Sequence, residues 1–266
     1  MSFAGLRVAA FESRRAAEIG ELIRKQGGEP FVAPAMREVA LADNDAAFQF
    51  AERLFAGGFD MVMLLTGVGT RQLNRLLATR YEAAAFAAAL RRVTVVVRGP
   101  KPAAALRELG LTPTVTVPEP NTWREMLAAT EGRPERRIAV QEYGRENPEF
   151  LEALRARGAE VTSVRIYQYG LPENPEPLRE AARRLAAGEF QVALFTTAVQ
   201  IEHLMRVAVE QGIAAAALDA LKRCFVASIG PTTTEALEEF GIHPNMEPSH
   251  PKMGLLVMEA AARAGS

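Results

Sequence analysis

Short runs of apolar residues, each bounded by turn residues, recur along the whole chain. Such near-continuous hydrophobic runs predict parallel β-strands that are covered on both faces. Between them, apolar residues return at helical spacing, as in Leu22 with Ile23 and Leu151 with Leu154, and predict amphipathic helices. Strand–helix alternation of this kind predicts an α/β fold with a doubly wound parallel sheet. The expected strands are Arg7–Glu12, Met61–Thr66, Val93–Val97, Thr114–Val117, Ile138–Gln141, Val192–Thr197 and Phe225–Ile229.

Three segments of the first half of the chain return in the second half, in the same order and at an offset of about 130 residues. In the clearest pair, Gly99-Pro100 is followed by a Leu, a Glu and a Gly, and Gly230-Pro231 is followed by the same three residues at the same spacing. One such match could be chance, but three in order indicate an internal duplication. We therefore expect two similar lobes. The matched segments are 7–10 with 137–140, 59–66 with 190–197, and 99–110 with 230–241.

Two stretches do not fit the repeating pattern of strands and helices. Pro30–Val39 and Glu160–Gly170 are long, extended and placed equivalently in the two copies. We expect them to be strands that cross between the lobes. The connector 170–177 that follows is rich in proline and cannot be helical until after Pro177.

Composition and charge narrow the functional classes. The chain has 266 residues, which is enough for two domains, and its formal net charge of −1 gives no reason to expect nucleic-acid binding. The single cysteine, Cys224, excludes an internal disulfide and lies in an apolar run, so we expect a buried, inert thiol. We find no signal peptide and no apolar stretch long enough to span a bilayer. A cytoplasmic protein without membrane contact is expected.

Four turns at the carboxyl ends of expected strands are candidate binding elements. Parallel sheets bind ligands at this edge, where small residues and the unpaired N–H groups of helix N-termini accept carboxylates or phosphates. The alternative is that each turn is an ordinary helix cap. If all four converge, a site in the cleft between the lobes is the stronger interpretation. The turns are Thr66–Thr70, Arg98–Pro102, Thr196–Gln200 and Ile229–Thr234.

Common catalytic motifs are missing from these turns. Gly67-Val68-Gly69 lacks the third glycine of a dinucleotide fingerprint, and no glycine-rich loop ends in Gly-Lys-Ser/Thr. The three histidines share no ligand spacing and there is no cysteine pair, so we expect no metal site. Tyrosine hydroxyls remain as neutral donors at pH 7. Tyr81 is expected to be structural, and the pattern alone does not choose among Tyr143, Tyr167 and Tyr169.

Several segments, in order, resemble the uroporphyrinogen-III synthase family over nearly the whole chain. The strongest is 229–237 followed by Gly241, which is similar to the C-terminal signature of that family. The run 195–199 resembles its Phe-Thr-Ser turn. The segment 154–161 leading to Ile166-Tyr167-Gln168 resembles its helix and strand before a Val-Tyr-Gln.

The resemblance implies two similar doubly wound parallel-sheet lobes joined by a two-stranded ladder. Lobe 1 would be discontinuous and consist of residues 1–36 and 170–266, and lobe 2 would consist of residues 37–169. The two extended stretches would then hold the crossings between the lobes.

The resemblance also implies an activity. The family closes the linear tetrapyrrole hydroxymethylbilane to uroporphyrinogen III, with loss of water and inversion of the last pyrrole ring. No metal or organic cofactor is implied. The partners would be this polycarboxylate substrate and the hydroxymethylbilane synthase that supplies it, and the chain is expected to act as a monomer.

Residue roles follow from the turns and the resemblance together. The resemblance implies that Tyr167 assists departure of the hydroxyl as a hydrogen-bond donor. For Arg14, Arg98 and Lys101 a solvated surface role is the alternative to carboxylate binding. The candidates for substrate binding are Arg14, Thr66, Gly67, Arg98, Gly99, Lys101, Tyr143, Gly144, Thr196, Thr197, Ala198, Gly230, Thr232 and Thr233.

Two other classes of function share the expected architecture. A non-catalytic two-lobed binder or sensor of an anionic small molecule would have the same duplication and cleft, but the chain shows no export signal and no DNA-binding module. An enzyme acting on a nucleotide-bearing substrate is disfavoured by the missing phosphate-loop motifs.

Overall fold

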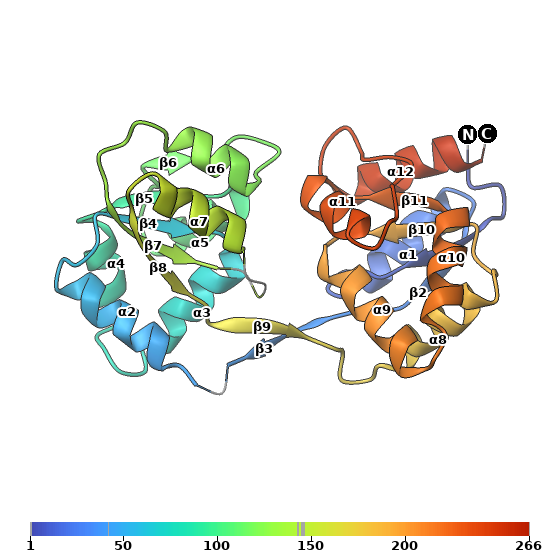
Figure 1. Cartoon of the computed structure of the whole chain (residues 1–266), viewed down its shortest axis with the longest axis horizontal. Helices are drawn as coiled ribbons and strands as arrows, with labels where there is room; N and C mark the ends of the chain where they lie inside the picture. Colours follow the sequence, from blue (N-terminus) through green and yellow to red (C-terminus); the bar gives the residue numbers. More distant parts are fainter. Residues whose placement is uncertain (1, 42, 143, 145–146, 266) are drawn as a thin grey trace. The chain divides into compact units, whose positions relative to one another are not determined.

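The structure is a computed structural model that describes residues 2–41, 43–142, 144 and 147–265. Contacts between Cα atoms divide the chain into two compact units. Unit 1 comprises Met1–Arg37 and Gly170–Ser266, and unit 2 comprises Glu38–Tyr169. The first and last segments of the chain therefore belong to the same unit (Figure 1).

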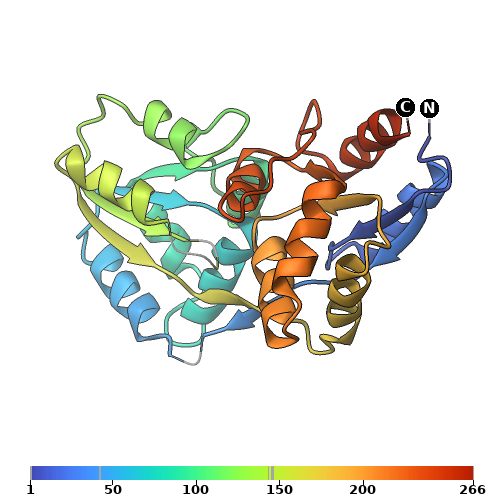
Figure 2. The ribbon, with the colours of Figure 1, turned by 45° about the vertical axis from the view of Figure 1, so that its right-hand side comes forward.

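Unit 1 is built on a four-stranded sheet in which every pairing is parallel. Alternate residues of its strands face opposite sides, so Ala9 packs in one apolar cluster and its neighbour Val8 in another. Four helices cover the Ala9 side: α8 (Glu176–Ala186), α9 (Val199–Glu210), α10 (Ala214–Arg223) and α11 (Pro231–Glu238). Figure 2 shows α9 and α10, in orange, side by side. The other side is covered by α1 (Ala16–Lys25) and α12 (Met253–Ala264). The strand order is β11 (Phe225–Ser228), β10 (Val192–Phe195), β1 (Arg7–Ala10) and β2 (Glu29–Val32).

Unit 2 is built in the same way on a five-stranded parallel sheet. One face packs on α2 (Asp45–Phe55), α3 (Gly67–Leu77), α4 (Ala85–Leu90) and α5 (Pro100–Glu108). The opposite face packs on α6 (Trp123–Ala129) and α7 (Pro148–Ala156), which Figure 1 shows across the strands from α2 and α3. The strand order is β6 (Val115–Thr116), β5 (Thr94–Val97), β4 (Met61–Leu64), β7 (Arg137–Gln141) and β8 (Glu160–Val164). The predicted α/β class with two parallel sheets is confirmed.

Strand registers agree with the internal duplication predicted from the sequence. Adding 131 to both numbers of the pair Met61–Thr94 gives Val192–Phe225, which is the pair that β10 and β11 form. By the same offset, the counterpart of the short β6 is Met246, which makes an isolated parallel bridge to β11. The two sheets thus share one arrangement, in which β10, β11, β1 and β2 correspond to β4, β5, β7 and β8.

The two extended stretches are each divided in the structure. Sequence reasoning treated residues 30–39 and 160–170 as strands that cross between the lobes. Their first parts instead complete the two sheets as β2 and β8, and only their second parts pair with each other. In the first stretch the break is at Pro34, which has no N–H to donate, and Ala35 donates its N–H to Ser13 Oγ (3.1 Å). The resulting two-stranded sheet, which contains both chain crossings between the units, consists of β3 (Arg37–Ala40) and β9 (Tyr167–Gly170).

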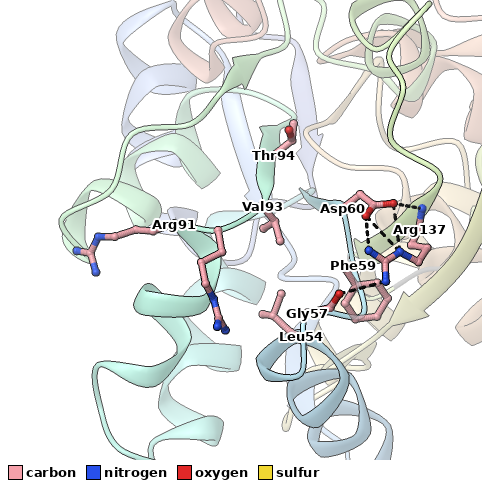
Figure 3. Close-up of a pocket in the computed structure, with 9 residues that line it drawn as sticks. Leu54, Gly57, Phe59, Asp60, Arg91, Val93, Thr94 and Arg137 are labelled. Atoms are coloured by element: carbon pink, nitrogen blue, oxygen red, sulfur yellow. Dashed lines mark hydrogen bonds and ion pairs between the residues drawn. The ribbon is translucent and has the colours of Figure 1, made fainter.

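Asp60 fixes the start of β4 between its two neighbours in the sheet. Its carboxylate accepts the backbone N–H of Arg137 on β7 (2.9 Å) and a further bond from the Arg137 guanidinium, while Thr94 of β5 donates its N–H to the Asp60 carbonyl (2.9 Å). Figure 3 shows this pairing. The hydrogen bonds from the Arg137 side chain and backbone lower the pKa of Asp60 to about 2. Asp60 therefore aligns β4 and β7, whose far ends carry the candidate residues of unit 2.

Removing this carboxylate is predicted to destabilise the protein in a pH-dependent way. Because the pKa of Asp60 is lower in the folded state, its contribution is complete above about pH 4 and is lost as the pH falls toward 2. The Asp60 side chain is about a third exposed and that of Arg137 nearly half, so solvent screens the pair. We expect Asp60→Asn to lower the free energy of unfolding by about 1 kcal/mol at pH 7. Urea unfolding at several pH values measures the difference from wild type.

The matched control for this experiment is Glu152→Gln on α7, an exposed carboxylate with no ion pair among the described residues. It should unfold like the wild type at every pH. If the difference in free energy of unfolding between Asp60→Asn and the wild type stayed constant from pH 7 to pH 2.5, the role given to the Asp60 charge would be contradicted.

Candidate functional site

Each sheet has one position where the strand order reverses, and the candidate residues follow the strands on either side of it or the next strand, β5 or β11. In unit 2 the order reverses between β4 and β7, and in unit 1 between β1 and β10. Because all pairings are parallel, the carboxyl ends of these strands lie at one edge of each sheet. Ligands of open α/β sheets bind at such points.

The turn after β4 is held close to the turn after β5. Thr66 begins α3, and its hydroxyl accepts the backbone N–H of Gly69 (3.0 Å). A Cβ atom at Gly67 would lie 2.5 Å from the carbonyl oxygen of Lys101, so this approach of two backbones requires glycine. The structure therefore brings together the candidates Thr66, Gly67 and Lys101.

Gly99 begins α5 and has no side chain to cap it. A Cβ atom there would overlap the amide of Asn121, which lies against the Gly99 backbone. Arg98 donates its N–H to the carbonyl oxygen of Leu64 (3.1 Å), which ties this turn to the end of β4. The first turn of α5 is thus an open helix N-terminus beside the Thr66 turn.

Tyr167, the predicted hydrogen-bond donor, reaches the same turn. Its side chain is 0% exposed, and its hydroxyl lies 3.3 Å from Thr66 Oγ1 and 3.5 Å from the hydroxyl of Tyr169. Gly144 lies against β9, because a Cβ atom there would be 3.0 Å from the backbone nitrogen of Tyr169. Tyr143 lies outside the described residues. Unit 2 thus gathers three hydroxyls and two helix N-termini at one sheet edge.

In unit 1 the turn after β10 is more closed than we predicted. Gln200 is fully buried, and its Oε1 accepts the N–H groups of Thr196 (2.7 Å) and Thr197 (3.3 Å). The Thr196 hydroxyl donates to Glu12 and accepts from Gln200 Nε2 (2.8 Å). The expectation that this turn offers unpaired backbone donors to a ligand was therefore wrong for Thr196 and Thr197, because a glutamine from the following helix satisfies both.

Other groups of unit 1 remain at the edge of the sheet. Within the described ranges, the hydroxyls of Thr197 and Thr232 make no hydrogen bond with protein atoms, and both residues are partly exposed. Gly230 begins α11 without a side-chain cap. Thr233 is buried, so its side chain is less accessible than that of Thr232.

The two remaining candidates of unit 1 flank these turns. Arg14 is exposed in the turn after β1 and donates its backbone N–H to Glu12 Oε1 (2.9 Å). Ala198 is buried at the start of α9, so only its backbone could meet a ligand.

A sequence model described as "Uroporphyrinogen-III synthase HemD" matches residues 17–258 of this chain. The chain belongs to the uroporphyrinogen-III synthase family. That span includes residues of both sheets and every candidate except Arg14.

Individual proteins are similar to this chain over nearly its whole length. The protein YjjA of Bacillus subtilis (strain 168), named only as uncharacterized, is 31% identical over 97% of this chain and 95% of its own. A crystal structure of mutant uroporphyrinogen III synthase from the extremely thermophilic bacterium Thermus thermophilus is similar with a TM-score of 0.73, at 27% identity, over 98% of both chains. A wild-type crystal form from the same organism has a TM-score of 0.56 at 28% identity, over 96% of both chains.

The sequence analysis did not identify the side chains that hold these turns in place by hydrogen bonds. Glu12 and Glu142 follow β1 and β7, and they are equivalent in the duplication at an offset of 130. Glu12 accepts from the Thr196 hydroxyl, and Glu142 is buried and accepts from Ser163 Oγ (2.8 Å). A glutamate at equivalent positions near the end of the same strand in both copies was the signal that could have identified them.

Gln141 of unit 2 has the capping role that Gln200 has in unit 1. Its Oε1 lies 3.4 Å from the Thr66 nitrogen, which donates to it. Its side chain fills the space beside Gly69, where a Cβ atom would overlap it. Gly69 is the duplication counterpart of Gln200 at an offset of 131. Unit 2 therefore supplies the capping amide from a strand, β7, and unit 1 supplies it from a helix, α9.

Conventional nucleophiles and metal ligands do not gather at these turns. Burial raises the pKa of the Cys224 thiol to about 11, so the thiol is protonated at neutral pH, as expected for an inert residue. Burial lowers the pKa of His203, whose Nδ1 lies 2.8 Å from the carbonyl oxygen of Ala35. Among the described residues there is no group of three potential metal ligands, and no helix is long and apolar enough to cross a membrane.

A hollow of about 530 Å³ lies at the opposite edge of the unit 2 sheet (Figure 3). It is lined by Asp60, Thr94 and Arg137, at the amino ends of β4, β5 and β7, and by Arg91 and Arg92. None of the predicted site residues lines it. We place the candidate site at the carboxyl edges instead, because the turns and open helix ends lie there.

Replacing the buried cap of unit 1 is predicted to destabilise the family fold. In Gln200→Leu the N–H groups of Thr196 and Thr197 lose their acceptor, which costs about 1–3 kcal/mol. Urea unfolding followed by circular dichroism measures this loss. Gln26→Leu, which changes a partly exposed glutamine of the same unit, is the control and should unfold like the wild type. Equal stability of the two variants would show that the Gln200 amide has no capping role.

Proposed function

We propose that this chain is a uroporphyrinogen-III synthase, a lyase that cyclises hydroxymethylbilane to uroporphyrinogen III with loss of water. The last pyrrole ring is inverted through a spiro intermediate. The enzyme would act in tetrapyrrole biosynthesis, as a monomer supplied by hydroxymethylbilane synthase. The reaction transfers no electrons to or from an external partner, so it calls for no redox cofactor.

The observation that carries the proposal is the kind of group at the two carboxyl edges. They present the hydroxyls of Thr197 and Thr232 in unit 1, together with the uncapped helix starts at Gly99 in unit 2 and Gly230 in unit 1. Each helix N-terminus stabilises a nearby carboxylate by about 0.3–1 kcal/mol. A substrate with many carboxylates needs many such donors, and the family match over residues 17–258 supports the assignment.

The proposed chemistry depends on conformation more than on acid–base strength. Hydroxymethylbilane can close without an enzyme to the uninverted isomer, so the enzyme must hold the chain in the geometry that leads to inversion. Departure of the hydroxyl leaves a cationic azafulvene, which the substituted carbon of the last ring attacks. Positioning and stabilisation of developing charge are the contributions expected of such a site.

Isomer analysis tests the proposed function. Purified protein is added to freshly made hydroxymethylbilane, and the products are oxidised and separated. We expect isomer III to predominate and to form much faster than the spontaneous reaction forms isomer I. The same mixture without protein is the control and should give isomer I.

Isomer I alone, formed at the spontaneous rate, would overturn the assignment. A protein that binds hydroxymethylbilane tightly in calorimetry but gives only isomer I would instead be a non-catalytic binder of an anionic small molecule.

A further inference from the structure

The hollow at the amino edge of the unit 2 sheet is positively charged. Among the described residues that line it, three arginines and one carboxylate are ionised at neutral pH, which gives the lining a net charge of +2. The carboxylate, Asp60, is already paired with Arg137. The excess charge is therefore that of Arg91 and Arg92, which follow α4 and precede β5.

Two of these arginines are held by the end of α2. Arg92 donates from Nη2 to the carbonyl oxygen of Phe55 (3.1 Å), and Arg137 donates from Nη1 to that of Gly57 (3.1 Å). Figure 3 shows the second bond beside those from Arg137 to Asp60. Because the two carbonyls are two residues apart on one turn, the protein itself fixes both guanidinium groups against that turn.

These hydrogen bonds leave further donors on the same side chains. A guanidinium group has five N–H groups. Among the described residues, Arg92 uses one of them and Arg137 uses three, and the side chain of Arg91 makes no hydrogen bond or ion pair. All three residues are exposed, so their remaining N–H groups are accessible to a ligand.

The neighbouring acidic residue Glu135 does not compete for these donors. Its carboxylate accepts from the hydroxyl of Thr94, which lines the hollow (2.6 Å), and pairs with Arg133, which does not line it (2.6 Å). The charge of Glu135 is therefore balanced by a residue outside the hollow, and the lining keeps its positive excess.

The size and chemistry of the hollow favour a phosphate group. Its volume of about 530 Å³ is in the range of small-molecule sites, which is about 300–1,000 Å³. Guanidinium groups are planar forks that bind phosphate oxygens through two parallel hydrogen bonds. A phosphate monoester carries close to two negative charges at neutral pH, which matches the excess of the lining.

We propose that this hollow binds the phosphate or diphosphate group of a small molecule through Arg92 and Arg137, with Arg91 as a third cation. The proposal does not depend on the proposed function, whose substrate carries carboxylates and no phosphate and is placed at the carboxyl edges. A ligand held by Arg92 and Arg137 joins the starts of β5 and β7, so its binding should stabilise the protein against unfolding.

Titration with inorganic pyrophosphate at constant ionic strength tests the site. In isotope-labelled protein the backbone amide signals of Gly57, Val93 and Thr94 should shift and saturate, with a Kd of about 1 mM or below. Pyrophosphate should raise the thermal unfolding midpoint by a few degrees. Arg92→Gln removes one guanidinium group and should weaken binding about tenfold. Arg92→Lys keeps the charge without the fork and should restore only part of the affinity.

The matched control is Arg223→Gln in unit 1. Arg223 is exposed and is the duplication counterpart of Arg92 at an offset of 131. This variant should bind pyrophosphate as the wild type does. Circular dichroism of all variants, recorded without pyrophosphate, should match that of the wild type, because the substituted side chains lie on the surface.

Three results overturn the assignment. They are the lack of any saturable shift up to about 20 mM pyrophosphate, a Kd for Arg92→Gln within about twofold of the wild type, and shifts confined to Gly99 and Gly230. The first two would show that the arginines only cap the end of α2. The third would place the anion at the open helix N-termini of the carboxyl edges instead.

Discussion

Parallel pairing of the strands is the constraint on which the rest of the structure depends. In both units every ladder is parallel, so each strand delivers its following turn to the same edge of the sheet. The strand order reverses between β4 and β7 and between β1 and β10. At these two places the turns are not crowded by a crossing helix, and they can hold a ligand. Asp60 reinforces the arrangement from the opposite edge by fixing β4 against β7.

The duplication preserved this framework while the side chains at the two edges diverged. Registers repeat at an offset of 130 or 131, and Gly-Pro begins the equivalent helices α5 and α11. The cap of the central turn is Gln141 from a strand in unit 2 and Gln200 from a helix in unit 1. Unit 1 presents threonine hydroxyls, and in unit 2 the hydroxyl of Tyr167 lies beside that of Thr66.

Much of the fold could be predicted from the sequence because its strands are buried on both faces. All seven expected strands are present, with ends that differ by a few residues. The division of 30–39 into two strands could not be predicted, since β2 is a half-exposed edge strand that carries Pro30. Caps such as Gln200 were missed because a buried amide pairs through the fold and leaves no periodic signal. The pattern alone did not choose among Tyr143, Tyr167 and Tyr169, and Tyr167 was selected by the family resemblance. Tyr167 and Tyr169 show why the pattern could not choose. They are two residues apart on one strand, and only packing decides which is covered.

The account places the ligand-binding groups of each unit at the carboxyl edge of its sheet, and backbone amide chemical shifts test that placement most directly. Titration of isotope-labelled protein with uroporphyrinogen III, kept anaerobic, should move the amide signals of Gly67, Thr197 and Thr232. The signals of Thr94 and Arg137, beside the hollow at the opposite edge, should stay in place. Shifts confined to Thr94, Arg137 and their neighbours, with the carboxyl-edge turns unchanged, would contradict the account.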